Sequence, residues 1–395
     1  MKVLFVVSRV PYPPWRGDQV RAYHLLRVLA KRHRITCAVL ALRPPNPVDL
    51  QAVRALGVDV VVHPLGLAGA IPAGLRAVLG VEPFQVTLYR RARAEARLTE
   101  VVARGSFDLV HAQLVRTAPY ALPLADRVTV VVDLVDALSL AFQRRSEREP
   151  WPLRMLARSE AARLRAYESW VLARAAQSIV VAPEDAAAVG GDQAPVVVPN
   201  GVLATDFDPP GPSARIPGRI VFAGNLGYFP NVDAACWLAE SVLPRIRAGE
   251  PTAHLRLVGA RPSRAVRALA RREAVSVVAN VPNMSAELSG AALTIISMRT
   301  GAGVQNKTLE ALAARLPVVT TPMVVRALGL TAGENVLVGA DAPALAEQAI
   351  RLIRSPELGT RLAARGRALV EQAFSWDVAG DRVDMVWRQA CSGHP

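Results

Sequence analysis

The segment between Ser297 and Thr321 (SMRTGAGVQNKTLEALAARLPVVTT) has the spacing of residues best suited to hold a charged ligand. An apolar run ends where this segment starts, a glycine loop follows, and a helical pattern begins near Asn306. Glycine lets the backbone approach a ligand closely, and the first turn of a helix offers free N–H groups with positive dipole charge. The pattern predicts a diphosphate site at the start of this helix.

Three side chains at the start of the helix add chemistry to that site. Lys307 contributes a cation, Thr308 contributes a hydroxyl and an amide, and Glu310 lies one turn further along. A carboxylate at this distance is placed to accept hydrogen bonds from a ribose diol. An ordinary α/β loop with a surface lysine stays open as the structural alternative.

A nucleotide-triphosphate loop is a second alternative for the same residues. The pattern G-x-x-x-x-G-K-[ST] fits Gly301 to Thr308 except that Asn306 replaces the second glycine. The loop also comes late in its domain, and no acidic partner for Mg²⁺ follows it. These departures disfavour a triphosphatase.

Polar residues also follow the predicted strands of the first half. Gly17 and Asp18 start a helix after the first strand, and His111 ends a later strand on the edge expected to face a ligand. A lone histidine is more often structural, so both roles stay open. Asp133 and Asp136 end the next strand; one is expected to pair with arginine, and Asp136 to orient an acceptor hydroxyl.

The string Asp206-Phe207-Asp208 resembles a D-x-D metal motif. It lies in a predicted linker, so we interpret it as structural. No metal is required if helix ends and cations stabilise an anionic leaving group.

Short β-branched apolar runs alternate with helical patterns along the whole chain, which predicts parallel sheets with crossover helices. The strands expected in the first half are Val3–Val7, Ile35–Leu40, Asp59–His63, Leu109–His111, Thr129–Asp133, Ser178–Ala182 and Val196–Pro199. Those expected in the second half are Arg219–Ala223, His254–Gly259, Val275–Val278, Leu293–Ser297, Val318–Thr321 and Val336–Val338. The expected helices include Arg154–Ala175, Val232–Arg247, Ser263–Ala270, Ser285–Gly290, Lys307–Ala314 and Ala342–Arg354.

Two domains of similar construction are expected. Residues 208–218 (DPPGPSARIPG) have linker composition and separate residues 1–207 from 219–375. Each half opens with an apolar strand, a Gly/Pro loop and a helix, so ligands are expected at the carboxyl ends of both sheets, across a central cleft. The last helix, 376–390, is expected to pack back onto the first domain.

The composition describes a globular protein, with 51% hydrophobic and 20% charged residues. Its net charge of +14 has two interpretations: solvated arginine-rich helix faces, or attraction to an anionic membrane leaflet or a phosphate-bearing substrate. No helix-turn-helix, zinc-finger or aromatic-basic signature indicates nucleic acid as a partner.

The sequence favours a cytoplasmic protein. Its three cysteines, Cys37, Cys236 and Cys391, lie far apart and predict neither disulfides nor a zinc site. The apolar run Val3–Val7 is too short for a secretory signal and is expected to be a buried strand. No stretch reaches the roughly 18 apolar residues of a membrane span.

The glycine loop, Lys307, LEALA (309–313) and PVVT (317–320) together resemble the signature of glycosyltransferase family 4, which has the GT-B fold. PNGV (199–202), LVGARP (257–262) and FSW (374–376) agree with family segments in the same order. The VPYPP-x-x-GD opening at 10–18 and GxQNKxLEA at 303–311 are most similar to sugar transferases associated with exopolysaccharide and PEP-CTERM systems. The resemblance covers nearly the whole chain and is more specific in its second half.

The resemblance implies two Rossmann-like domains and a donor site on the second. The donor would be a nucleoside diphosphate sugar, with no other cofactor. The contacts implied on the second domain are Gly224, Asn225, Arg261, Asn280, Val281, Arg299, Gly301, Gly303, Lys307, Thr308, Leu309 and Glu310. Arg261 would meet the diphosphate, Arg299 would neutralise phosphate charge, and backbone at Asn280 and Val281 would read the base. On the first domain, Gly17 and Asp18 would face donor phosphate or acceptor, and Gln113 matches the family's catalytic histidine better than His111 does.

One departure concerns Ala302, which stands where many family members carry the first glutamate of an E-x7-E motif. The resemblance therefore implies retaining, metal-independent transfer to a glycan or lipid-linked acceptor, but not the identity of the sugar. A sugar-nucleotide epimerase and a non-catalytic binding protein on the same fold stay open as alternatives.

Overall fold

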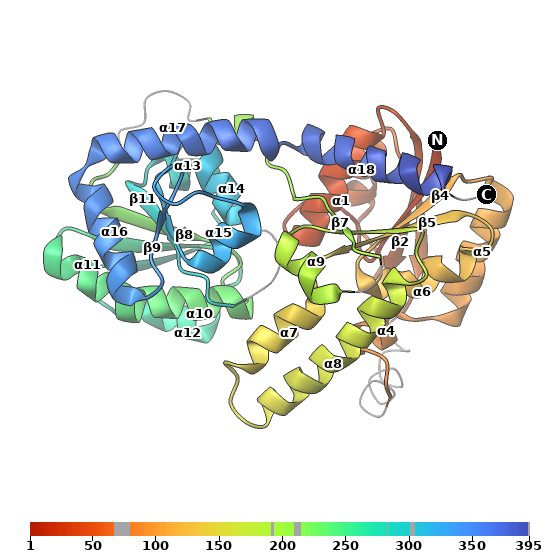
Figure 1. Ribbon diagram of the computed structural model, residues 1–395, viewed down its shortest axis with the longest axis horizontal. Helices are drawn as coiled ribbons and strands as arrows, with labels where there is room; N and C mark the ends of the chain where they lie inside the picture. The colour runs from red at the N-terminus through yellow and green to blue at the C-terminus, as the bar shows by residue number, and fades with distance from the viewer. Residues whose placement is uncertain (67–79, 191–192, 209–214, 282, 301–304, 394–395) are drawn as a thin grey trace. The chain divides into compact units, whose positions relative to one another are not determined.

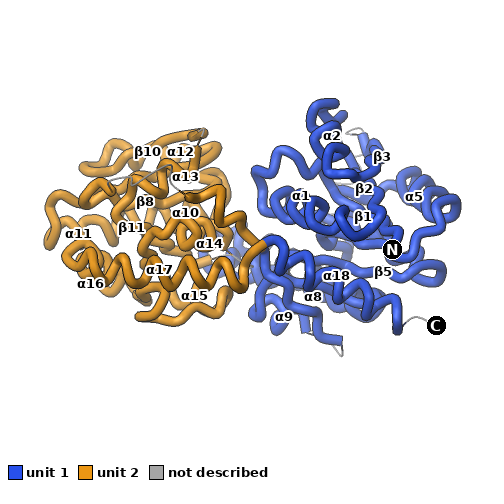
Figure 2. The backbone as a smooth tube through the Cα atoms, turned by 90° about the horizontal axis from the view of Figure 1, so that it is seen from above, with its two compact units in different colours: residues 1–200, 376–395 blue, residues 201–375 orange. Residues whose placement is uncertain are grey.

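The chain forms two compact units in a computed structural model that describes residues 1–66, 80–190, 193–208, 215–281, 283–300 and 305–393. Unit 1 comprises Met1–Asn200 and Trp376–Pro395, and unit 2 comprises Gly201–Ser375 (Figure 2). The first boundary thus follows Asn200, whereas the sequence placed it after residue 207.

Unit 1 is built on a parallel sheet with the strand order β3-β2-β1-β4-β5-β6-β7. Its strands are β1 (Lys2–Val7), β2 (Arg34–Ala41), β3 (Asp59–Pro64), β4 (Leu109–Gln113), β5 (Thr129–Val135), β6 (Gln177–Val180) and β7 (Val196–Val197). The central strands are apolar along their whole length because helices cover both faces of a parallel sheet.

The helices of unit 1 connect these strands and cover the sheet (Figure 1). They are α1 (Gly17–Leu29), α2 (Pro47–Arg54), α4 (Phe84–Tyr89), α5 (Ala92–Gly105), α6 (Ala118–Ala121), α7 (Leu138–Ser146), α8 (Leu153–Leu172), α9 (Pro183–Val189) and α18 (Trp376–Ser392).

Helix α18 belongs to unit 1 although it ends the chain, and it lies beside α1 (Figure 1). The Trp376 ring stacks on His24 of α1, with 4.8 Å between ring centroids. Trp387 Nε1 donates to His111 Nδ1 at 3.0 Å, and His33 Nε2 lies 2.9 Å from Asp384 Oδ1. Apolar packing and side-chain hydrogen bonds therefore hold α18 on this unit.

Unit 2 repeats the arrangement with the parallel strand order β10-β9-β8-β11-β12-β13. Its strands are β8 (Arg219–Ala223), β9 (His254–Gly259), β10 (Val275–Ala279), β11 (Leu293–Ile296), β12 (Val318–Thr320) and β13 (Leu337–Val338). Its helices are α10 (Phe229–Trp237), α11 (Leu243–Gly249), α12 (Arg264–Leu269), α13 (Met284–Ser289), α14 (Asn306–Ala313), α15 (Pro322–Leu328), α16 (Ala342–Arg354) and α17 (Pro356–Ala373).

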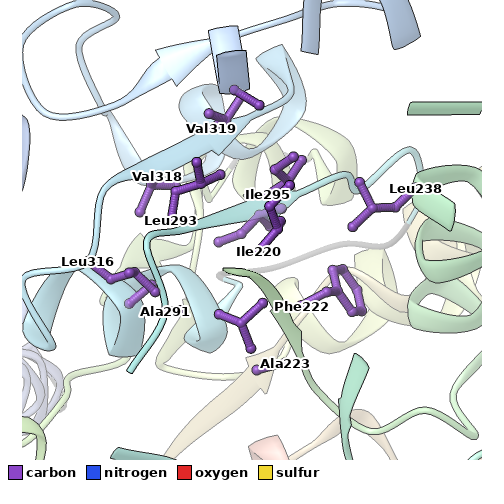
Figure 3. Close-up of a cluster of buried hydrophobic side chains, with 14 of the residues drawn as sticks. Ile220, Phe222, Ala223, Leu238, Ala291, Leu293, Ile295, Leu316, Val318 and Val319 are labelled. Carbon is purple, nitrogen blue, oxygen red and sulfur yellow. The ribbon is translucent and has the colours of Figure 1, made fainter. Parts of the chain in front are cut away.

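The core of unit 2 forms where apolar side chains of β8, β11 and β12 meet (Figure 3). Ile220, Phe222, Leu293 and Ile295 are each almost completely buried there. The predicted fold class, two Rossmann-like α/β domains with parallel sheets, is confirmed.

The single helix predicted at Val232–Arg247 is wrong in one respect. The structure has α10, a π-helical turn at Leu238–Val242, and then α11. Pro244 has no backbone N–H to donate, so the regular ladder is interrupted in the turn before it.

The D-x-D string takes part in a structural contact. Its residues lie at a short 3₁₀ helix, Ala204–Phe207, and Asp208 forms an ion pair with Arg367 of α17 at 2.9 Å. Among the described residues, no group of three or more His, Cys, Asp or Glu side chains is arranged to hold a metal ion. Within the same residues, no helix combines the length and apolarity of a membrane span.

An ion pair without solvent exposure ties α1 to the strands of unit 1. Arg21 Nε donates to Asp133 Oδ2 at 2.6 Å, and both side chains are 0% exposed. The same guanidinium donates to the Val198 carbonyl and to Asn200 Oδ1. Asp133 is thus the aspartate that pairs with arginine.

Replacing Arg21 with methionine is expected to destabilise unit 1 by about 3–5 kcal/mol, because it leaves the Asp133 carboxylate buried without its partner. Urea-induced unfolding followed by tryptophan fluorescence measures the change. Arg32→Met is the matched control, since Arg32 pairs with Asp381 on the surface and both side chains are exposed. An equal loss of stability in both variants would contradict this account.

Candidate functional site

The strand order of unit 2 reverses between β8 and β11. The chain leaves β8 toward β9 on one side and continues from β11 toward β12 on the other. Loops diverge at such a point, and ligands of open α/β sheets bind there, outside the carboxyl ends of the strands. Gly224 follows β8 and Met298 follows β11, so both lie at this edge.

Lys307, on the first turn of α14, is the central cation at this edge. Its Nζ donates to Asn231 Oδ1 at 2.5 Å and lies 3.3 Å from both Gln305 Oε1 and Met298 Sδ. The ammonium also lies 5.3 Å from the centre of the Phe222 ring. No carboxylate of a described residue pairs with it. Burial lowers the pKa of Lys307 from its usual value to about 7.

Asn231 of α10 holds this lysine in place. Its amide donates to the Asn225 carbonyl at 3.0 Å and its oxygen accepts from Lys307. Asn225 in turn accepts, through its own side chain, from the Gly227 N–H at 3.1 Å. The loop after β8 therefore orients the neutral oxygen that faces the ammonium. Sequence reasoning missed Asn231.

Two glycines allow the loops at this edge to approach each other. A Cβ on Gly224 would lie 3.1 Å from Asn231 Nδ2 and 3.3 Å from Lys307 Cε. A Cβ on Gly259, at the end of β9, would lie 1.6 Å from the Gly224 carbonyl oxygen. A side chain at Gly259 would therefore displace the loop that holds Asn231.

Glu310, one turn after Lys307, is partly buried. Burial raises the pKa of its carboxyl group, and the nearby Lys307 charge opposes this shift. The two groups form no ion pair, but the charge of each favours the charged form of the other. Their placement on one helix agrees with the spacing in the sequence.

Two buried threonine hydroxyl groups, one on each side of residues 301–307, lack partners among the described residues. The side chains of Thr300 and Thr308 are 1% and 0% exposed, and neither Oγ1 has a hydrogen-bond partner among the described residues. A buried hydroxyl without a partner costs free energy, so these oxygens are available to a ligand or to bound water. Leu309 is packed in the core, so a ligand could contact only its backbone. Gly301 and Gly303 lie outside the described residues.

Arg299 already has a partner within unit 2. The sequence resemblance implies that it neutralises phosphate charge, and its guanidinium pairs with Asp233 of α10 at 2.6 and 3.1 Å. Its Cζ also lies 4.6 Å from the centre of the Trp237 ring. The ion pair joins the segment after β11 to α10, and the predicted contact of Arg299 with phosphate stays a prediction.

Arg261, Asn280 and Val281 follow the ends of β9 and β10 at the same edge of the sheet. Arg261 is exposed and has a backbone φ of 52°, while Asn280 has a φ of 53° and donates its N–H to the Gly259 carbonyl. Val281 is partly buried against the core. The predicted contacts of Arg261 with phosphate and of the other two with a base stay predictions.

His111 also requires a correction. Its side chain is 0% exposed, stacks on Phe5 with 4.3 Å between centroids, and accepts a hydrogen bond from Trp387. Burial lowers the pKa of His111 to about 4. Because α18 covers the ring, the expectation that it faces a ligand is wrong, and its role is structural. Gln113 is buried too, and its amide donates to the Asp18 carbonyl at 3.1 Å.

The strand order of unit 1 reverses between β1 and β4, and a charged cluster lies there. Asp18, beside Gly17 at the start of α1, pairs with Arg9 at 3.1 Å and with Arg116 at 3.4 Å. Ser8 accepts from Arg116 at 2.9 Å. Sequence reasoning identified Gly17 and Asp18 but missed both arginines, although Arg9 directly follows the first strand.

Asp136 follows β5 and is partly buried. Burial, together with nearby Asp185, raises the pKa of its carboxyl group well above the usual range. A protonated carboxyl donates a hydrogen bond, so Asp136 can orient an oxygen at this edge of unit 1. Its role toward an acceptor stays a prediction.

Comparison with known proteins bears on unit 2 first. Residues 217–355 match the family model described as glycosyl transferases group 1. The chain has the GT-B fold. Together, the family match and this fold support a glycosyltransferase.

Solved GT-B structures match nearly the whole chain. Sucrose-phosphate synthase from Thermosynechococcus elongatus has a TM-score of 0.75 at 15% identity, and the match covers 100% of both chains. HepE from Anabaena, solved in complex with UDP-glucose, has a TM-score of 0.70 at 13% identity, covering 98% of this chain and 99% of that one. WaaG, a glycosyltransferase involved in lipopolysaccharide biosynthesis, has a TM-score of 0.64 at 16% identity, covering 97% and 99%. A search of curated proteins finds no match.

The Lys307 site predicts how stability depends on pH. The pKa of Lys307 is about 7 in the folded chain and near 10.5 in the unfolded chain, so the unfolded chain binds more protons between these values. Stability conferred through this group therefore rises with pH in that window. We expect the thermal midpoint of unit 2 to gain about 3 °C per pH unit between pH 7.5 and 9.

Lys307→Met should remove this rise, whereas Lys31→Met at an exposed position should keep it. Differential scanning fluorimetry across the pH range measures both. The same slope in wild type and Lys307→Met would show that this lysine is fully hydrated.

Proposed function

We propose that this protein is a glycosyltransferase that moves a sugar from a nucleoside diphosphate sugar to a glycan or lipid-linked acceptor. The observation that carries the proposal is the Lys307 ammonium at the strand-order reversal of unit 2. It is held by neutral oxygen and sulfur atoms, and no described carboxylate pairs with it. An anionic ligand would supply the missing counter-charge.

The diphosphate of the donor suits this position best. The amino end of α14 adds positive dipole charge beside Lys307, and the Thr308 hydroxyl has no other described partner. Arg261, exposed at the same edge, would add a second cation. That HepE was solved with UDP-glucose supports a nucleotide sugar as the ligand class.

In the proposed reaction, the bond from the anomeric carbon to the diphosphate oxygen breaks and a bond from the acceptor oxygen forms. The leaving diphosphate gains negative charge and takes up the proton that the acceptor hydroxyl gives up. Lys307 would stabilise the charge that develops on the leaving group, where little water screens it. Glu310 would accept hydrogen bonds from the ribose.

The finer parts of the proposal come from the sequence resemblance. We infer retention at the anomeric carbon, membership of glycosyltransferase family 4 and a role in exopolysaccharide or cell-surface glycan synthesis. We also propose a cytoplasmic protein with peripheral contact to the inner membrane leaflet. Cations and a helix end would do the work of a metal in stabilising the diphosphate, so the proposed enzyme keeps its activity in the presence of a chelator.

Replacing Lys307 with alanine is expected to lower kcat/KM by about 10²–10³, the usual effect of removing one group that stabilises developing negative charge. The measurement is release of nucleoside diphosphate from a panel of UDP-, GDP-, ADP- and TDP-sugars with a mixed glycan acceptor preparation.

Lys31→Ala serves as the control for this loss, because Lys31 is exposed and belongs to unit 1. Conversion of the donor to an isomer without acceptor would favour an epimerase. Donor binding without diphosphate release would favour a non-catalytic protein. Normal turnover by Lys307→Ala would remove this lysine from the mechanism.

Diphosphate binding near pH 8 is expected to take up almost one proton. The free lysine, with a pKa of about 7, is mostly neutral at that pH, and a bound anion favours its charged form. Titration calorimetry in two buffers of different ionisation enthalpy measures the uptake, using whichever of UDP, GDP, ADP or TDP stabilises the protein most.

Lys307→Met should bind the same diphosphate more weakly and without proton uptake. Calorimetry measures diphosphate binding alone, so its result reports on the donor site and is independent of any defect in sugar transfer. Equal uptake by both proteins would assign the proton to another group.

A further inference from the structure

A run of exposed apolar side chains forms the start of α8. All six residues from Trp151 to Leu156 are exposed, and four of them are Trp, Leu, Met and Leu. Trp151 is 78% exposed and Leu156 is 65% exposed. Soluble surfaces rarely carry so many consecutive large apolar residues unless a partner covers them.

This run lies at the end of a helical hairpin. Ser139 Oγ donates to Glu168 Oε2 at 2.5 Å, and Arg165 Nη2 donates to Gln143 Oε1 at 2.5 Å. These contacts join the start of α7 to the end of α8, so the two helices are antiparallel. Residues 147–152 form the turn that connects them. Figure 1 shows the hairpin, in yellow, projecting away from the sheet of unit 1.

The base of the hairpin is anchored, and its end is not covered by the rest of unit 1. Glu168 is 0% exposed and caps the Ser139 N–H, while Asp185 of α9 accepts from the Ala137 N–H. By contrast, Trp151 and its neighbours up to Leu156 remain exposed. We call residues 147–158 the hairpin tip.

Positive charge surrounds the apolar residues of the tip. Between residues 144 and 165 the chain carries seven arginines and three glutamates. Arg148, Arg154 and Arg158 are exposed, and none of them forms an ion pair with a described residue. Glu149, in contrast, is largely buried and paired with Arg145 at 2.9 Å.

We propose that the hairpin tip inserts into the surface of a bilayer that contains anionic lipid. Trp151, Leu153, Met155 and Leu156 would enter the boundary between headgroups and acyl chains, where tryptophan and leucine are favoured. The three arginines would remain at the level of the lipid phosphates, each adding attraction to the negative surface. A nucleic acid would use the arginines but leave the leucines and methionine exposed to water.

This surface goes beyond sugar transfer itself, although it suits an enzyme whose proposed acceptor is lipid-linked. The interaction needs neither donor nor acceptor. A failed test with vesicles alone would therefore count against the proposed membrane contact and leave the proposed sugar transfer untouched.

The first experiment is flotation of the full-length protein with phosphatidylcholine vesicles, with and without about 30 mol% phosphatidylglycerol, at low salt. We expect binding to the anionic vesicles and little binding to the neutral ones. The double variant Trp151→Ser/Leu156→Ser should lose about 10- to 100-fold in partition coefficient, because two large apolar side chains no longer enter the bilayer.

Two further variants separate the contributions. Arg154→Gln/Arg158→Gln should bind anionic vesicles about tenfold or more weakly at low salt, and the difference should shrink at about 0.5 M salt. Val48→Ser, at an exposed position on α2, is the matched apolar control and should bind like the wild type.

A positional readout tests insertion directly. Lipids brominated on the acyl chain should quench tryptophan fluorescence in the wild type, and Trp151→Phe should bind equally well with much less quenching. Absence of flotation by the wild type, or equal flotation by the Ser double variant, would overturn the proposal. A third outcome would also overturn it: the wild type self-associates in sedimentation velocity, the double variant does not, and vesicles bind neither protein. The tip would then bind a second copy of the chain.

Discussion

A partly buried ammonium group without a paired carboxylate is the constraint on which the site of unit 2 depends. Lys307 loses hydration, and its pKa falls to about 7. Its described hydrogen-bond and ring partners are neutral: the Asn231 oxygen, the Gln305 oxygen, the Met298 sulfur and the Phe222 ring. The charge of Glu310, one helical turn away, opposes the loss of hydration only in part. Such an environment is costly for a resident cation and favourable for a cation that receives an anionic ligand.

The backbone around this lysine is organised by small residues. Gly259 lets the loop after β8 pass within contact of β9, and Gly224 leaves room for both Asn231 and Lys307. Asn231 is oriented in turn by the Asn225 carbonyl. The position of Lys307 thus depends on Asn231, and that of Asn231 on the loop after β8. A Cβ at Gly259 on β9 would displace this loop and therefore also Lys307.

Much of the fold follows from local pattern, because strands buried on both faces are apolar runs and most of them are followed by a loop with Gly or Pro. Ala342–Arg354 was predicted with the bounds that the structure has. The break between α10 and α11 was not, since a prolonged helical pattern masked the effect of Pro244. Lys307 was singled out from the sequence because it follows a glycine loop at the start of a helix, and its role toward a ligand stays a prediction.

The contacts that the sequence did not predict at the candidate sites share a physical cause: a partner that is distant in sequence. Arg299 pairs with Asp233, which lies 66 residues away, and His111 is covered by Trp387, which lies 276 residues away. Neither contact has a local signature, and an arginine or a histidine at the end of a strand has the same appearance whether or not it is paired. Asn231 was not predicted for the same reason, because its partner Lys307 lies on α14, far from α10 in the sequence.

The two units use the same strand-order reversal with different electrostatics. In unit 1, Asp18 lies between Arg9 and Arg116, so the charges at the β1/β4 edge partly cancel before any ligand arrives. In unit 2, the lysine at the β8/β11 edge forms no ion pair with a described carboxylate, while Arg299 is paired with Asp233. A common backbone topology determines where a ligand can lie, and the pairing of a few charged side chains determines which edge attracts an anion more strongly. The anion site that we propose on unit 2 therefore rests on its side-chain pairing and not on its fold.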